Sequence, residues 1–173
     1  MRIVVFLMVA IFSSVSYGEL DSKYDFQAIN YLQQRDYRSL EIKYSELIRL
    51  YKKDSITDEV IFEAFNKLAK ESDDSQEQIY DEWVNKYPSS YVALISRGHY
   101  MSEKAWRARG NKYTGKTPSD NMERFVQYSM KAKSDLLNSI KYDNKPILNY
   151  LMLILINGRV DGFYGVHDSM KPP

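Results

Sequence analysis

Apolar residues recur along this chain at steps of three and four, and alternation at steps of two is almost absent. Steps of three and four place side chains on one face of an α-helix, whereas strict alternation would indicate β-strands. The pattern therefore predicts an all-α fold of about seven helices. The expected helices cover residues 22–34, 37–52, 58–71, 74–87, 90–110, 120–140 and 147–156.

Acidic residues mark the expected starts of two helices. Asp74 and Glu77 are three residues apart at the start of the fourth helix, and Asp120 and Glu123 repeat the spacing at the sixth. This spacing is typical of a capping box. Because aspartate is strongly preferred at helix N-termini, we interpret the adjacent acids Asp73 and Asp74 as helix-start residues and not as an acid–base pair.

The C-terminal part of the chain combines a very apolar segment with a glycine-rich one. Residues 147–156 form the most apolar of the expected helices, so we expect it to be the most buried. Asn157 and Gly158 are expected to end this helix. Three glycines lie between Gly158 and Gly165, which predicts an irregular C-terminal tail over residues 158–173.

The N-terminus has the pattern of an export signal. Arg2 precedes an uncharged apolar run of ten residues, Ile3 to Phe12, and small residues follow at Ser16 and Gly18. This order predicts a cleavable signal peptide with cleavage after Gly18. A retained membrane anchor is the less favoured alternative, because a spanning helix needs about 20 apolar residues.

We therefore expect a signal peptide at 1–18, a helical repeat-like domain at 19–157 and the tail at 158–173. The product would be secreted, or periplasmic in a Gram-negative bacterium, without a stable membrane anchor. The chain has no cysteine, which excludes both disulfides and a lipid-modified N-terminal cysteine. Its 24 Lys and Arg residues nearly equal its 23 Asp and Glu residues, and this balance argues against nucleic acid as a partner.

Short connections between consecutive helices predict antiparallel hairpins. Ala132, Leu136 and Ser139 match the alternation of small and large positions in tetratricopeptide repeats, and Leu94 and Gly98 match an earlier unit. In these positions the chain resembles a tetratricopeptide-like right-handed stack of helical hairpins with irregular units. Solenoids of this kind bind extended partners on one face.

A second resemblance rests on three pieces of sequence. They are Trp83-x4-Pro88-x-Ser90-x2-Ala93, Ala105-Trp106-x-Ala108-Arg109-Gly110, and Phe125. These pieces resemble domain of unknown function 4034, a family of mostly exported bacterial proteins, over about residues 37–157. The resemblance implies no catalytic residue or cofactor, since the family has no established activity. Its members usually continue for further helices, which leaves open whether this chain is a C-terminally truncated version.

One string matches a nucleotide-binding motif. Gly110, Gly115, Lys116 and Thr117 fit the P-loop pattern G-x4-G-K-[ST]. A working P-loop follows a buried strand and opens a helix, so that backbone N–H groups can surround phosphate. Here the preceding segment is charged and helical, and Pro118 follows at once. We therefore interpret the match as fortuitous and expect no cofactor.

Other catalytic and metal-binding patterns are missing from the sequence. His99 and His167 are far apart, and neither lies in an H-E-x-x-H motif, so no metal site is expected. Neither G-x-S-x-G nor a cysteine nucleophile is present. This absence favours a protein that is not an enzyme.

The fifth expected helix carries a candidate binding patch of His99, Tyr100, Trp106, Arg107 and Arg109. In the functional interpretation, Trp106 forms an apolar floor and Arg109 anchors a carboxylate or phosphate. In the alternative, Trp106 fills the seam between two hairpins and Arg109 pairs inside the fold. We favour this alternative, because tryptophan at helical spacing usually belongs to a core.

These observations together favour an exported, non-enzymatic module that binds a protein or peptide. An immunity protein against a toxin is an alternative of the same binding class, suggested by the small exported chain. A cell-envelope hydrolase is the enzymatic alternative, suggested only by the compartment.

Overall fold

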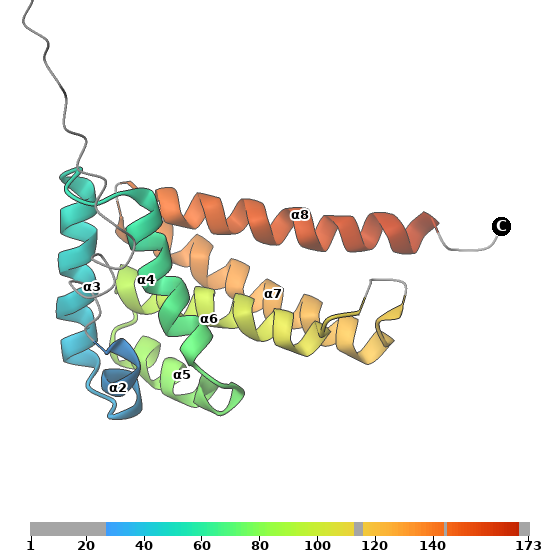
Figure 1. Cartoon of the computed structure of the whole chain (residues 1–173), viewed down its shortest axis with the longest axis horizontal. Helices are drawn as coiled ribbons and strands as arrows, with labels where there is room; N and C mark the ends of the chain where they lie inside the picture. Colours follow the sequence, from blue (N-terminus) through green and yellow to red (C-terminus); the bar gives the residue numbers. More distant parts are fainter. Residues whose placement is uncertain (1–26, 113–115, 144, 170–173) are drawn as a thin grey trace, which may run out of the picture.

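The computed structural model describes residues 27–112, 116–143 and 145–169 (Figure 1). Every regular element in these ranges is helical, as the spacing of apolar residues predicts. The elements are α2 (Ala28–Gln33), α3 (Tyr37–Lys52), α4 (Asp58–Glu71), η1 (Asp74–Gln76), α5 (Glu77–Lys86), α6 (Tyr91–Arg109), α7 (Ser119–Ser139), η3 (Ile140–Tyr142) and α8 (Ile147–Ser169). The predicted signal peptide, 1–18, and the start of the first expected helix lie outside the described residues.

Helices α3 and α4 have the predicted bounds and form an antiparallel hairpin. The rings of Tyr44 on α3 and Phe65 on α4 lie 4.7 Å apart. The Tyr44 hydroxyl donates a hydrogen bond to the carbonyl oxygen of Ala64 at 3.0 Å. A large aromatic side chain can thus be buried in this hairpin with its polar atom satisfied.

Helix α6 is the central helix of the molecule. It packs against α3, α4, α5, α7 and α8. Its N-terminus is capped by Ser90, whose hydroxyl accepts a hydrogen bond from the backbone N–H of Ala93 at 3.1 Å. Its C-terminus ends at Gly110, whose φ of 74° suits a residue without Cβ.

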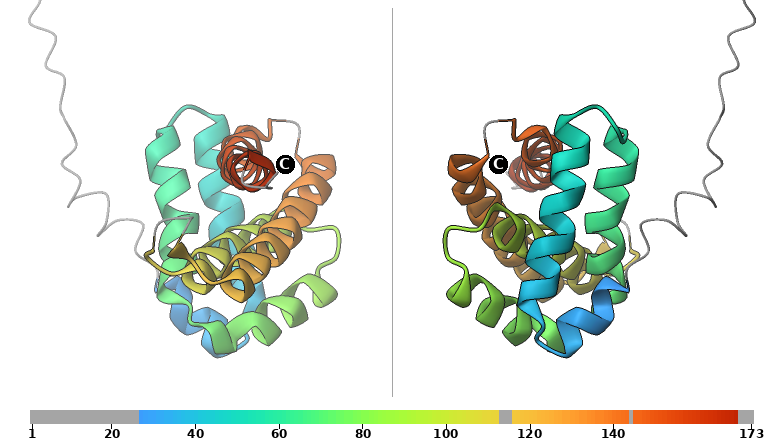
Figure 2. Two further views of the ribbon diagram at one scale, coloured as in Figure 1. Left: turned by 90° about the vertical axis from the view of Figure 1, so that its right-hand side faces the viewer. Right: turned by 90° about the vertical axis from the view of Figure 1, so that its left-hand side faces the viewer.

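Helices α6 and α7 run antiparallel and come close at Gly98. A Cβ added to Gly98 would lie 2.9 Å from Leu136 Cγ and 3.5 Å from the carbonyl oxygen of Ala132. Figure 1 shows α7 and α8 meeting near the start of α8 and diverging towards its end, while α3 and α4 run steeply across these helices. Figure 2, which looks along α8, shows the same arrangement from both ends.

The two predicted capping boxes do not form. At η1 the capping carboxylate is that of Asp73, which accepts from the backbone N–H of Ser75 at 2.7 Å, while Glu77 binds lysines of α6 and α7 instead. Helix α7 begins one residue earlier than expected, after Pro118, with no side-chain cap. The start of η1 is therefore capped by Asp73 in place of Asp74, while Glu77 forms tertiary ion pairs and Pro118, with its fixed φ, precedes α7.

Helix α8 differs from the prediction in length. We expect it to end at Asn157 and an irregular tail to follow from Gly158, but the helix continues to Ser169. An interior glycine costs a helix only about 1 kcal/mol relative to alanine. A Cβ placed at Gly158 would have no neighbour within 4 Å, so this glycine neither reverses the chain nor meets another helix.

Helix α8 also differs from the prediction in burial. Leu148, Met152, Leu153 and Ile156 are buried against the rest of the fold. Four other large hydrophobic side chains are exposed, and their exposed fractions are 52% for Tyr150, 40% for Leu151, 68% for Ile154 and 40% for Leu155. The expectation that this helix is the most buried is wrong, because only one side of it meets α6 and α7. Within the described part of the chain, no helix has the length and apolar character needed to cross a membrane.

Candidate functional site

The five residues of the predicted patch lie on α6 but do not share one surface. His99 and Tyr100 are buried, with 1% and 0% of their surfaces exposed. Trp106 and Arg109 are partly buried, and Arg107 is exposed. The patch predicted from helical spacing is therefore divided between the core and the rim of the α6–α7 pair.

His99 packs between two phenylalanine rings of α4. The centroids of Phe62 and Phe65 each lie 5.6 Å from that of the imidazole. His99 Nδ1 is 3.2 Å from Asn66 Oδ1, and His99 Nε2 has no hydrogen-bond partner among the residues that the structure describes. Burial lowers the pKa of His99 to about 3, so the ring is neutral in the folded protein. His99 is thus a core residue that joins α4 to α6.

Tyr100 lies in a stack of aromatic rings beneath η1. Its ring is 4.4 Å from that of Tyr80, and its hydroxyl donates to the carbonyl oxygens of Asp73 and Asp74 at 3.1 and 3.3 Å. Burial raises the pKa of Tyr100 above its ordinary value. Tyr100 therefore fastens the turn before α5 to α6 and offers no free hydroxyl for a ligand.

Trp106 and Arg109 form a local pair at the C-terminal end of α6. The Trp106 ring lies 5.3 Å from the ring of Phe125 on α7. The Arg109 guanidinium lies 5.3 Å from the Trp106 ring centroid, within the range of a cation–π contact. Trp106 thus lies in the seam between α6 and α7, with Arg109 packed against it.

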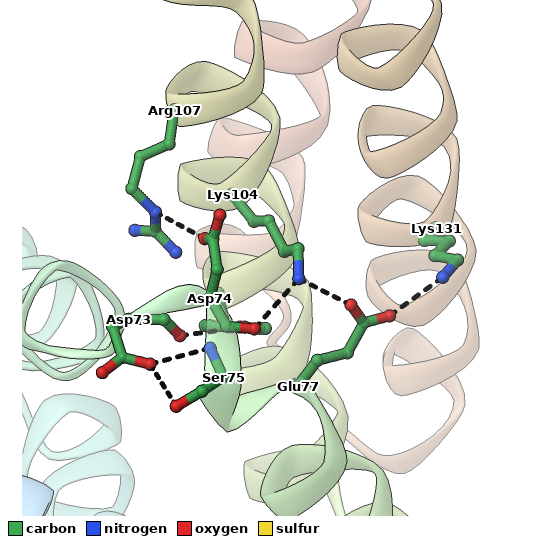
Figure 3. A network of polar contacts seen from close by, with 8 residues as sticks. Asp73, Asp74, Ser75, Glu77, Lys104, Arg107 and Lys131 are labelled. Atoms are coloured by element: carbon green, nitrogen blue, oxygen red, sulfur yellow. Dashed lines mark hydrogen bonds and ion pairs between the residues drawn. The ribbon is translucent and has the colours of Figure 1, made fainter.

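Arg107 belongs to a charged network that the sequence did not reveal (Figure 3). Its Nε donates to Asp74 Oδ1 at 2.9 Å. Lys104 Nζ donates to Glu77 Oε2 at 2.7 Å and to the carbonyl oxygen of Asp74 at 3.1 Å, and Lys131 Nζ donates to Glu77 Oε1 at 2.9 Å. The network ties the start of α5 to α6 and to α7.

Glu77 is the centre of this network. Burial alone would raise its pKa, but the hydrogen bonds from Lys104 and Lys131 outweigh burial and hold the pKa of Glu77 below its usual range. The ammonium group of Lys104 also lies 5.0 Å from the ring centroid of Tyr128. Because each of these charges already faces an opposite charge, the network suits the fastening of helices better than the capture of an anion.

A second charged group lies further along the α6–α7 seam. Arg97 donates two hydrogen bonds to the carboxylate of Asp135 on α7, at 2.8 and 2.7 Å, and one to Asp81 on α5 at 2.9 Å. The side chain of Asp135 is only 7% exposed, so a two-point contact from a guanidinium is the partner it needs. The carboxylates that bind Arg97 lie on α5 and α7, 16 and 38 residues away in sequence, so no local pattern indicates them.

Trp83 and Ser90, which belong to the family-like pattern in the sequence, have a structural role. Glu41 on α3 accepts a hydrogen bond from Trp83 Nε1 at 2.8 Å, and its two carboxylate oxygens accept from the Ser90 hydroxyl at 2.9 and 2.7 Å. Burial raises the pKa of Glu41, although these hydrogen bonds oppose the shift. Since Ser90 also caps α6, one carboxylate fixes the connection between α5 and α6.

The P-loop-like string follows a helix. Gly110 ends α6, and the Thr117 hydroxyl donates to the carbonyl oxygen of Lys112 at 3.2 Å. Lys116 is exposed, and Gly115 lies outside the described residues. A P-loop needs a buried strand at its start, and the place of that strand is taken by α6. In the ranges that the structure covers, no three His, Asp or Glu side chains gather as metal ligands.

The strongest candidate for a binding surface is the outward side of α8, a site that the sequence analysis did not propose. We call Tyr150, Leu151, Ile154 and Leu155 the outer face of α8. Steps of three and four place these side chains in one stripe. No charged residue occurs between Pro146 and Gly158, so the stripe has no charged flank over this length.

Fold and side chains together define an all-helical protein whose hairpins are fastened by buried charged and aromatic contacts. Within that class, the chain belongs to the family described as "Domain of unknown function (DUF4034)", whose model matches residues 5–160. This result confirms the resemblance inferred from Trp83, Ala105 to Gly110, and Phe125. Comparison with curated proteins and with solved structures finds no match.

Proposed function

We propose that this protein is an exported, non-enzymatic module that binds another protein through the outer face of α8. One observation carries the proposal. Tyr150, Leu151, Ile154 and Leu155 are 40–68% exposed and lie side by side on α8. Contiguous exposed apolar patches commonly mark interaction sites.

The arrangement of hairpins supports the same proposal. Gly98, Ala132 and Leu136 meet at the α6–α7 crossing, as the small and large positions of a tetratricopeptide-like pair would. We propose that the chain contains a short stack of such hairpins, with α8 packed on α7 and α6. Helical hairpins that stack in this way commonly bind partners on an exposed face.

The proposal that the protein is exported rests on the N-terminal sequence pattern, which consists of Arg2, the apolar run Ile3 to Phe12, and Gly18. A signal peptide cleaved after Gly18 would deliver the helical domain to the periplasm or the medium. The partner would then be a protein or peptide of that compartment, and neither a cofactor nor nucleic acid is required.

Site-specific photo-crosslinking in the producing cell tests the proposal. A photoreactive amino acid replaces Ile154 on α8 in one variant and Ile42 on α3 in the control. Both isoleucines are exposed, by 68% and 58%, and they lie on different helices. We expect a discrete protein adduct from position 154 and none from position 42. Equal adducts from both positions, or none from position 154, would contradict the proposal.

A further inference from the structure

We propose that the partner of the outer face of α8 is the same face of a second copy of this chain. The two α8 helices would pack antiparallel about a two-fold axis. This inference rests on the proposed function and makes it specific, since it names the protein that is bound.

The outer face is self-complementary in the antiparallel direction. A two-fold axis passing midway between residues 152 and 153 places Tyr150 opposite Leu155 of the second copy and Leu151 opposite its Ile154. A two-fold interface requires this reciprocity, because each residue must meet a partner that meets it in return. Each of these pairs joins two apolar side chains.

The ends of the stripe fit the same axis. The axis places the partly buried Ile147 opposite Gly158 of the second copy. Gly158 is exposed and has no atom within 4 Å of a Cβ position, so there is room at this point for a branched side chain from another helix. A large residue opposite a glycine allows two helices to approach closely.

The charge pattern favours a like partner over a charged one. Because residues 146–158 include no Asp, Glu, Lys or Arg, antiparallel pairing brings no like charges together along this length. A partner with charges on its helix would have to bury them without a counter-charge. A lipid surface is less suited, since helices that lie on membranes usually carry Lys or Arg on the opposite side.

The size of the face sets the expected strength. Four side chains that are 40–68% exposed form a patch of a few hundred Å². Stable complexes bury about 800 Å² on each partner. The dimer should therefore be reversible, with a dissociation constant in the micromolar range.

Sedimentation velocity of the purified exported protein over a range of concentrations tests this inference. We expect a monomer–dimer equilibrium that Ile154→Asp weakens at least tenfold, because the substitution buries an unpaired carboxylate near the axis. Ile42→Asp is the matched control and should leave the equilibrium unchanged. Leu151→Asp provides a second variant, and circular dichroism verifies that each variant is folded.

Single cysteine substitutions test whether the two α8 helices pair antiparallel. The natural chain has no cysteine, so any disulfide reports only on the introduced residues. A mixture of Leu151→Cys and Ile154→Cys copies should form the mixed disulfide faster than either like pair. A parallel dimer would favour the like pairs and would overturn the antiparallel arrangement.

The outcomes separate the inference from the function on which it rests. A protein that stays monomeric while position 154 crosslinks a different protein overturns the self-association and leaves the binding function standing. Monomer together with no adduct at position 154 overturns both. Binding to neutral phosphatidylcholine vesicles that Ile154→Asp abolishes, with no dimer in solution, would assign the face to lipid and also overturn the inference.

Discussion

His99 and Lys104 lie on the same helix, and both are almost excluded from water, at 1% and 7% exposure. Lys104 keeps two oxygen acceptors, the Glu77 carboxylate and the Asp74 carbonyl. His99 has only the Asn66 amide oxygen and two aromatic neighbours, so the folded state favours its neutral form. Both side chains connect helices, and the buried histidine makes its connection depend on pH.

Acid should therefore destabilise the fold through His99. The pKa of His99 is about 3 in the folded protein, whereas its ordinary value of 6.5 applies to the unfolded chain. Between these two pH values the unfolded chain therefore binds a proton that the folded chain does not. The stabilising effect is complete above about pH 6.5 and is lost as the pH falls towards 3, by at most about 1.4 kcal/mol per pH unit. Urea unfolding between pH 7 and about pH 5 should show this slope.

The control for this prediction is His99→Gln, which removes the titrating group. The variant should be less stable than the natural protein at pH 7, because the packing between Phe62 and Phe65 changes. Between pH 7 and pH 5 the free energy of unfolding should fall by about 2 kcal/mol less in the variant than in the natural protein. Parallel pH curves for the two proteins would show that His99 does not carry the acid sensitivity.

At the scale of helices, the spacing of apolar residues predicted where some helices begin and end, whereas tertiary contacts determined how others begin. Periodicity predicted the bounds of α3 and α4, because each has a single apolar side and clear ends. The start of α5 differs from the predicted capping box, because Glu77 binds Lys104 and Lys131 and does not cap its own helix. Lys104 and Lys131 lie far from Glu77 in the sequence, so a local sequence pattern cannot predict these contacts.

The α6–α7 crossing gives a prediction about two glycines. Gly98→Ala should destabilise the protein by about 1 kcal/mol, because a clash with Leu136 costs about 1–3 kcal/mol and exceeds the gain in helix propensity of about 1 kcal/mol. Gly158→Ala on α8 is the matched control, since nothing lies near its Cβ position. It should stabilise by up to about 1 kcal/mol. Urea unfolding at low protein concentration measures both.

A double substitution tests the cause of the Gly98 effect. In a Leu136→Ala background the clash is removed, so Gly98→Ala should become neutral or stabilising relative to that background. If the cost of Gly98→Ala stays the same with Leu136 absent, the close approach of α6 and α7 is not its cause.

At the scale of the whole molecule, α6 is the element around which the others are arranged. Its central position explains why the predicted patch is divided, because a helix covered by five others has little surface to offer. The exposed apolar side chains Tyr150, Leu151, Ile154 and Leu155, through which we propose that a partner binds, lie on α8 at the side of the fold (Figure 1). The candidate site that we propose from the structure therefore lies on α8, whereas the patch predicted from the sequence lies on α6.

The same architecture predicts that nucleotide does not bind. The string from Gly110 to Thr117 follows the end of α6 and lacks the strand that positions phosphate in a P-loop. We expect the melting temperature to be unchanged by millimolar ATP and magnesium, since only a ligand of the folded state raises it. A saturable increase that Lys116→Ala abolishes would contradict this prediction.

The sequence by itself determined the helical class, the bounds of α3 and α4, and the family, because each rests on local spacing or on a motif. The tertiary structure decided what periodicity cannot show. Apolar spacing is the same on a helix that is buried on all sides and on one that is covered on one side only. Only the packing of α8 against α6 and α7 shows that Tyr150, Leu151, Ile154 and Leu155 face outward.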